Sequence, residues 1–221
     1  MRNYRFDGYK GIMSQADIIL VHGYGMALDL NEPEIPDNGS FSAFDPEINA
    51  GQALPFVWAE TMPRGAFTPY NASAQYTLYR REKASIFGSV LQHKLEDAIA
   101  ESQPRVIIAH SLGCYLVRNL LAQCTIPESL TYVVFLQADI PRSVPIPHIT
   151  GLNMINFWCW WDTSLLSSVV VNQRIPIGLA GSTDPYVHNV FVPIDKHIRG
   201  HARLLANRAY KRRIYQEIDK L

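Results

Sequence analysis

Short apolar runs alternate with longer amphipathic segments along this chain of 221 residues. A run of four or more apolar residues between turn-forming residues is typical of a buried strand. Such runs lie at residues 17–21, 54–58, 105–109, 130–136, 153–161 and 189–194. Segments whose apolar residues recur at helical spacing lie between several of these runs, so predicted strands and helices alternate. This alternation predicts an α/β domain with a mainly parallel sheet of about six strands and helices on both faces.

Three helices are predicted where apolar residues recur every three or four positions. The longest covers residues 74–100, and its charged residues, Glu82 and Lys83 among them, are expected in solvent. A second covers residues 112–124, directly after a strand. The third closes the chain at residues 201–220 as an amphipathic helix.

Two segments favour loops over regular structure. Residues 31–51 are rich in Pro, Asp, Asn and Gly, and residues 63–71 contain two prolines. Long loops inside a compact domain are often functional, so these two are the candidate lids of a fold without a large cap. A chain of this length can bury one sizeable core, and we expect a single domain over residues 1–221.

Composition narrows the class of protein. Basic and acidic residues number 20 each, so the net charge is zero and nothing favours a nucleic-acid partner. The three cysteines are irregularly spaced in apolar runs, which argues against a disulfide framework. The N-terminus lacks the apolar core of a secretion signal, and no apolar run is long enough to span a bilayer. We therefore expect a cytoplasmic protein without stable membrane insertion, and nothing indicates its oligomeric state.

Ser111 lies at the junction of a predicted strand and a predicted helix, in the sequence Ala109-His110-Ser111-Leu112-Gly113. A tight strand–turn–helix exposes a serine hydroxyl and aims the first amides of the helix at whatever the serine attacks. The usual pattern has glycine at both ends, and alanine is the smallest side-chain substitute. A serine that only caps a helix is the simpler alternative. The strand before it and the helix after it favour a nucleophile elbow.

A nucleophilic serine needs a base and a carboxylate that orients the base. In open parallel sheets these groups gather at the carboxyl ends of strands. Asp162 follows the predicted strand at residues 153–161 and is the favoured acid, with Asp139 and Asp184 as alternatives. The aromatic residues of that strand are expected to pack in the core rather than to line an acyl pocket.

Two histidines beyond the last strand are candidates for the base. His201 stands in a Gly-His pair before the final helix, the usual position of a triad histidine, and is favoured over His197. Their spacing would also suit two metal ligands, but no acidic residue lies between them and Gly200 disfavours a regular helix. A metal-dependent hydrolase therefore ranks below a serine hydrolase, and we expect no metal and no organic cofactor.

A glycine-rich turn, His22-Gly23-Tyr24-Gly25, follows the first predicted strand. Glycine permits a sharp turn and close approach of the backbone. The turn is expected to aim the Tyr24 amide at the same point as the Leu112 amide, which would form an oxyanion hole. A glycine turn with a packed histidine is the simpler alternative.

Together these motifs resemble the α/β-hydrolase superfamily, and in particular a branch of esterase- and lipase-like α/β-hydrolases of unknown function. The resemblance runs from about Ile18 to His201 and includes VHGYG, FVWAE, AHSLG, VVFLQADI, NFWCWWDTSLLS and RGH. It implies an α/β-hydrolase fold and supports Ser111, Asp162 and His201 as the triad. The chain departs from that branch at residues 58–60, where Trp-Ala-Glu replaces the usual Trp-Pro-Ser.

The expected function is hydrolysis of an ester or related acyl compound by a Ser-His-Asp triad through an acyl-enzyme. The expected partner is a small acyl substrate. A thioesterase or acyltransferase with the same triad is one alternative, and a non-catalytic binding protein on the same fold is another. The fold alone does not choose among ester, thioester and amide substrates.

Overall fold

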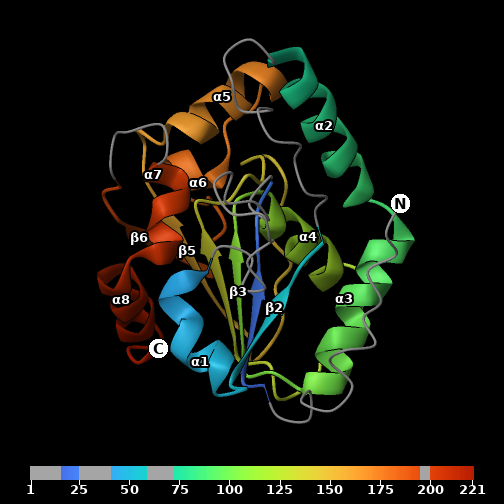
Figure 1. Ribbon diagram of the computed structural model, residues 1–221, viewed down its shortest axis with the longest axis vertical. Helices are drawn as coiled ribbons and strands as arrows, with labels where there is room; N and C mark the ends of the chain where they lie inside the picture. Colours follow the sequence, from blue (N-terminus) through green and yellow to red (C-terminus); the bar gives the residue numbers. More distant parts are fainter. Residues whose placement is uncertain (1–15, 25–40, 59–71, 195–199) are drawn as a thin grey trace.

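The computed structural model describes residues 16–24, 41–58, 72–194 and 200–221. The described residues form a six-stranded sheet with the order β2-β1-β3-β4-β5-β6, in which every neighbouring pair is parallel. The sheet stands at the centre of the molecule, between helices (Figure 1). The expected α/β class and parallel sheet are confirmed. The strands are β1 Ile18–Val21, β2 Ala53–Phe56, β3 Val106–His110, β4 Tyr132–Leu136, β5 Asn153–Trp158 and β6 Val187–Phe191.

Helices cover both faces of this sheet, as predicted. Their bounds are α1 Asp45–Asn49, α2 Ala72–Ser85, α3 Ser89–Ser102, α4 Leu112–Leu121, α5 Thr163–Asn172, α6 Ile177–Ala180, α7 Gly200–Arg203 and α8 Arg208–Ile218. In Figure 1, α1 and α8 lie on one side of the sheet and α3 and α4 on the other, whereas α2 and α5 lie towards the carboxyl ends of the strands.

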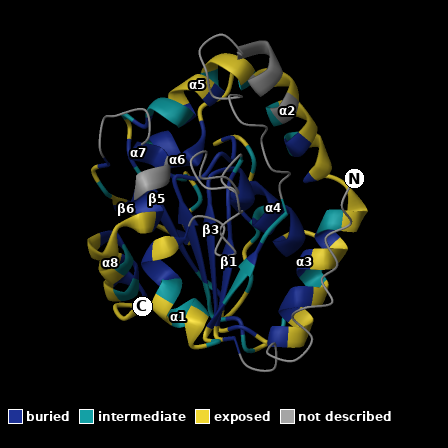
Figure 2. Cartoon of the chain, in the orientation of Figure 1, coloured by how far each residue is buried: buried dark blue, intermediate teal, exposed yellow. Residues whose placement is uncertain are grey.

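Side chains of β1 alternate between two cores, because successive residues of a strand point to opposite faces. Ile19 and Val21 pack with α3 and α4, whereas Ile18 and Leu20 pack with α8 and a 3-10 helix at Ser42–Phe44. The four inner strands β1, β3, β4 and β5 are accordingly buried along almost their whole length, whereas the edge strands β2 and β6 are partly exposed (Figure 2). A sheet covered on both faces explains the near-continuous apolar runs in the sequence.

The single helix expected at residues 74–100 is wrong, because the chain forms α2 and α3 with a break between them. Gly88 has an extended backbone at the N-terminus of α3, and Ile86 in the break is fully buried. Glu82 on α2, which was expected in solvent, is only 3% exposed.

Two other expectations need correction. Residues 42–49, expected within a loop, form the short 3-10 helix and α1, while residues 31–40 and 63–71 lie outside the described part of the chain. The predicted closing helix at residues 201–220 is divided into α7, a 3-10 turn and α8, because the Asn207 side chain caps α8 by accepting from the amides of Ala209 and Tyr210.

Within the described residues, no helix is long and apolar enough to cross a membrane. All three cysteines are free thiols, with Cys114 and Cys159 buried and Cys124 partly buried.

Candidate active site

Ser111 lies in a strained turn between β3 and α4. Its backbone φ is 53° and its ψ is −122°, a combination that non-glycine residues rarely adopt. Its amide donates a 2.9 Å hydrogen bond to the Leu136 carbonyl at the end of the neighbouring strand β4. The side chain is 8% exposed. Such strain persists only where the surroundings impose it, and here β3, β4 and α4 do so.

Two glycines allow the turns at this edge of the sheet to approach one another. A Cβ on Gly113 would lie 2.2 Å from the His22 carbonyl oxygen, so α4 begins directly against the end of β1. A Cβ on Gly23 would lie 2.7 Å from the Cβ of Ser111. The HGYG turn thus contacts the serine itself, and both positions require glycine because any side chain would collide there.

Trp58, which follows β2, fixes the turn at His22 and Gly23 through two hydrogen bonds to His22. Its indole N–H donates to the His22 carbonyl at 2.7 Å, and its backbone N–H donates to Nε2 of His22 at 3.0 Å. The Nδ1 of His22 therefore carries the proton and donates to the Gly23 carbonyl at 2.8 Å. Burial lowers the pKa of His22 to about 4, although that last hydrogen bond opposes the shift. This histidine is neutral and structural.

Asp162 and His201 are brought together at the carboxyl end of β5. The Nδ1 of His201 lies 2.5 Å from Oδ2 of Asp162, with Asp162 fully buried and His201 8% exposed. The other carboxylate oxygen caps α5 by accepting from the amides of Ser164 and Leu165. A carboxylate only accepts, so Nδ1 of His201 donates and Nε2 is the nitrogen that keeps a free lone pair.

Asp139, the first alternative acid, is engaged elsewhere. Its carboxylate accepts 2.7 Å hydrogen bonds from the hydroxyls of Tyr79 and Ser168, and Asn172 donates to both of these hydroxyls. Burial raises the pKa of Asp139, and the two hydroxyl donors partly offset this. Its backbone amide also donates to the Ser111 carbonyl at 3.1 Å. Asp139 thus supports the turn at Ser111 through the backbone and joins α2 to α5 through its side chain.

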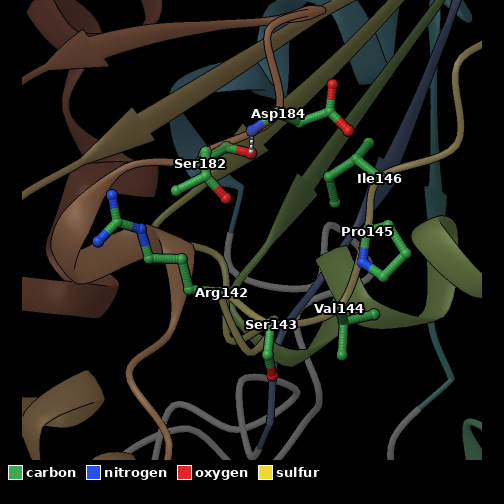
Figure 3. A pocket seen from close by; sticks show the side chains of 8 residues that line it. Arg142, Ser143, Val144, Pro145, Ile146, Ser182 and Asp184 are labelled. Carbon is green, nitrogen blue, oxygen red and sulfur yellow. Dashed lines mark hydrogen bonds between the residues drawn. The ribbon is translucent and has the colours of Figure 1, made fainter.

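Asp184, the second alternative acid, is a turn residue. Its carboxylate accepts from the Tyr186 amide at 3.0 Å, and its own amide donates to the Ser182 hydroxyl, as Figure 3 shows. Ser182 and Asp184 line a surface hollow of about 330 Å³ together with Arg142 and Ile146. None of Ser111, Asp162 and His201 lines this hollow, so it is not the site of the predicted chemistry.

His110 packs against His201. It precedes Ser111 in the chain, and its ring centroid is 4.5 Å from that of His201. Among the described residues no hydrogen bond joins the Ser111 hydroxyl to the His201 ring. Catalytic hydrogen bonds are often long until substrate is bound, so this arrangement is compatible with a serine and its base. His197, the alternative base, lies outside the described residues.

The two amides predicted to bind an oxyanion flank the serine in different ways. Leu112 is the first residue of α4, and a helix leaves its first four N–H groups without intrahelical acceptors. Tyr24 follows Gly23, the residue in contact with Ser111, and its ring packs edge-on against Tyr79 at 5.5 Å. Both backbone segments therefore lie next to Ser111.

Two residues of this site, Ser168 and Asn172, had no signal in the sequence, and their contacts cross 29 and 93 positions of the chain. Trp58 and Tyr79 belong to a predicted strand and a predicted helix, but nothing in the sequence indicated their hydrogen bonds to His22 and Asp139. In the part of the chain that the structure describes, no cluster of three or more His, Cys, Asp or Glu side chains could hold a metal ion.

No family model matches this chain, and no curated protein matches it in sequence. The class of protein therefore follows from structure alone. It is a parallel α/β protein with a strained serine turn after β3 and a buried histidine–carboxylate pair at the same edge of the sheet.

Proposed function

We propose that this protein is a serine hydrolase with an α/β-hydrolase fold, which cleaves an ester or related acyl substrate. The observation that carries the proposal is the buried hydrogen bond between His201 Nδ1 and Asp162 Oδ2. It leaves the second ring nitrogen available as a base on the edge of the sheet that holds Ser111. A short imidazole–carboxylate hydrogen bond that fixes the tautomer in this way is the requirement of a serine triad.

The order of the elements supports the fold proposed. Ser111 follows β3, Asp162 follows β5 and His201 comes after β6. This chain order of serine, acid and histidine is the one found in α/β-hydrolases, and it differs from the orders in other serine hydrolase folds. The positive φ of Ser111 between a strand and a helix also agrees with a nucleophile elbow.

In the acylation step, Oγ of Ser111 attacks the substrate carbonyl carbon while Nε2 of His201 takes the hydroxyl proton. Asp162 holds the imidazole in place and stabilises the positive charge that forms on it. The carbonyl oxygen becomes an oxyanion, which the Leu112 amide binds at the start of α4, with the Tyr24 amide as a second donor. Collapse of this intermediate breaks the bond to the leaving group, which receives the proton from His201.

In the deacylation step, water attacks the acyl-serine. His201 takes a proton from the water and returns it to Ser111 when the acid is released. The enzyme returns to its starting state without a metal or organic cofactor in either step.

The test is reaction of the purified protein with a fluorophosphonate probe, which labels only serines that a base has activated. Ser111→Ala and His201→Ala are the decisive variants, and His93→Ala is the matched control, because its side chain is 72% exposed on α3. We expect the wild type and the control to be labelled and the other two variants to remain unlabelled. Hydrolysis of p-nitrophenyl esters of increasing chain length then defines the acyl preference.

Other outcomes would change the conclusion. Labelling that survives Ser111→Ala would contradict the assignment of the nucleophile. A folded wild type that is neither labelled nor active on esters and thioesters would favour a binding protein on this fold. Turnover of acyl thioesters alone would assign the same three residues to a thioesterase.

A further inference from the structure

His110 makes a contact with His201 that the triad chemistry does not require. We propose that His110 is a positioning residue, which holds the backbone of His201 and so sets the distance between the base and the nucleophile. This inference rests on the proposed function, because it assigns a role within the same site.

The contact is a hydrogen bond between the Nε2 of His110 and the carbonyl oxygen of His201, at 3.0 Å. A carbonyl oxygen accepts only, so Nε2 carries the proton and Nδ1 has the lone pair. That Nδ1 is buried and has no hydrogen-bond partner among the described residues. A Cβ on Gly23 would lie 3.0 Å from it, so the HGYG turn closes over this side of the ring. The tautomer of His110 is thereby fixed.

Burial keeps His110 neutral. Its side chain is fully buried, and this lowers its pKa well below the ordinary value, with the nearby charge of protonated His201 acting in the same direction. A neutral His110 adds no positive charge beside the imidazolium that forms on His201 during the reaction. It can therefore pack 4.5 Å from that ring without opposing catalysis.

The position of His201 in the fold explains why its backbone needs the hydrogen bond from His110. His201 belongs to α7, a helix of four residues, whereas Ser111 extends from the buried strand β3. Asp162 holds the His201 ring at Nδ1, and His110 holds its main chain. Since His110 is the last residue of β3 and precedes Ser111, one strand end fixes both the nucleophile and the base.

The test compares His110→Gln with His110→Asn. The amide nitrogen of glutamine corresponds in reach to Nε2 of histidine, whereas that of asparagine corresponds to Nδ1 and falls short of the His201 carbonyl. Both replacements are neutral and polar, so they differ mainly in this one hydrogen bond. His93→Asn on the exposed side of α3 controls for the loss of a histidine.

We expect His110→Asn to lower kcat on a p-nitrophenyl ester about 100-fold, because misplacing a catalytic group by about 1 Å has an effect of this size. KM should change less than about threefold, since His110 does not contact substrate. His110→Gln should recover most of the lost kcat. In proton NMR spectra, the far-downfield resonance of the His201–Asp162 hydrogen bond should persist in His110→Gln and weaken or vanish in His110→Asn.

Equal kcat values in the two variants, with the downfield resonance intact in both, would overturn the role of His110. If His110→Asn fails to fold, a His110→Gln variant that folds with wild-type thermal stability but with a 100-fold lower kcat would equally overturn it. Folded wild-type protein that is neither labelled by a fluorophosphonate nor active on esters and thioesters would instead refute the proposed function. The two failures are therefore distinguishable.

Discussion

The carboxylate of Asp162 accepts a 2.5 Å hydrogen bond from Nδ1 of His201, and its other oxygen caps α5 through the amides of Ser164 and Leu165. One side chain thus ends the turn after β5, begins the next helix and orients the histidine. The helix cap holds one carboxylate oxygen while the other accepts from the histidine, so the two roles support each other.

Asp162→Asn should separate these two roles. The amide oxygen of asparagine can still cap α5, so the variant should fold with a melting temperature close to that of the wild type. It presents an N–H group or a weaker acceptor to Nδ1 of His201, which favours the wrong tautomer. We expect kcat/KM on a p-nitrophenyl ester to fall by roughly 10³- to 10⁴-fold.

Two other aspartates supply the controls for this prediction. Asp184→Asn should leave kcat/KM unchanged, because the hydrogen bonds of Asp184 to described residues are local turn contacts. Asp139→Asn should lower it less than tenfold, since the backbone amide that supports Ser111 remains. A larger loss in Asp139→Asn than in Asp162→Asn would identify Asp139 as the acid of the site.

Gly23→Ala should lower kcat strongly and have a smaller effect on the stability of the fold. The new Cβ would lie 2.7 Å from Cβ of Ser111, so the turn that contains Gly23 must move away from Ser111. Displacement of one oxyanion donor costs about 10² to 10³ in kcat. We expect a loss of that size in steady-state kinetics.

Gly151→Ala is the matched control for this glycine. Gly151 has a φ of +85°, so alanine is strained there, but no atom lies within 4 Å of the added Cβ. This variant should lose about 1 kcal/mol of stability and keep its kcat. If Gly23→Ala retained wild-type kcat, the close contact between the turn and Ser111 would have no bearing on activity.

Local sequence was sufficient to predict the parts of the site that depend on neighbouring residues. The apolar run before Ser111 and the small residues around it predicted a strand–turn–helix, and β3 and α4 flank the serine in the structure. The six parallel strands followed from the apolar runs because a sheet buried on both faces leaves a continuous apolar signal.

Features that depend on contacts between residues far apart in the chain could not be predicted from local sequence. The break between α2 and α3 lies inside a pattern that continues at helical spacing, and only packing of Ile86 and the extended Gly88 reveals it. The bond between Tyr79 and Asp139 joins residues 60 positions apart, so the sequence gives no sign of it. Glu82 was misplaced for the same reason, since its burial follows from where α2 lies.

Acid should destabilise the fold through His22. Burial lowers its folded-state pKa to about 4 from the ordinary 6.5, so the unfolded chain takes up a proton first as the pH falls. The contribution of neutral His22 to the free energy of unfolding is therefore fully present above about pH 6.5. It is lost between about pH 6.5 and pH 4, and the loss amounts to roughly 3 kcal/mol in total. His110 acts in the same direction, whereas the raised pKa of Asp139 acts in the opposite one.

Urea denaturation at intervals between pH 7 and pH 4 measures this decline. His22→Gln retains an acceptor for the Trp58 amide but has no titrating group, so its stability should fall less steeply with acid, by up to about 1.4 kcal/mol per pH unit. An identical pH slope in wild type and His22→Gln would mean that His22 titrates normally in the folded state.

Tyr79→Phe should weaken the attachment of α2 to the rest of the molecule. The phenol donates to Asp139 and accepts from Asn172, and Lys83 on the same helix donates to Asn172 at 2.7 Å. Removing the hydroxyl leaves the buried Asp139 carboxylate with one donor fewer, which costs about 1 to 3 kcal/mol. The free energy of unfolding in urea reports this loss, and faster amide exchange in α2 would localise it.

Tyr76→Phe on the same helix is the control, because Tyr76 is 44% exposed and its hydroxyl accepts a long, 3.5 Å hydrogen bond from Arg80. Its stability should stay within about 0.5 kcal/mol of the wild type. Equal effects of the two substitutions would show that the Tyr79 hydroxyl contributes no more than an exposed one. A loss confined to Tyr79→Phe, with faster exchange in α2 alone, would show that the polar network around Asp139 holds this helix at the carboxyl edge of the sheet.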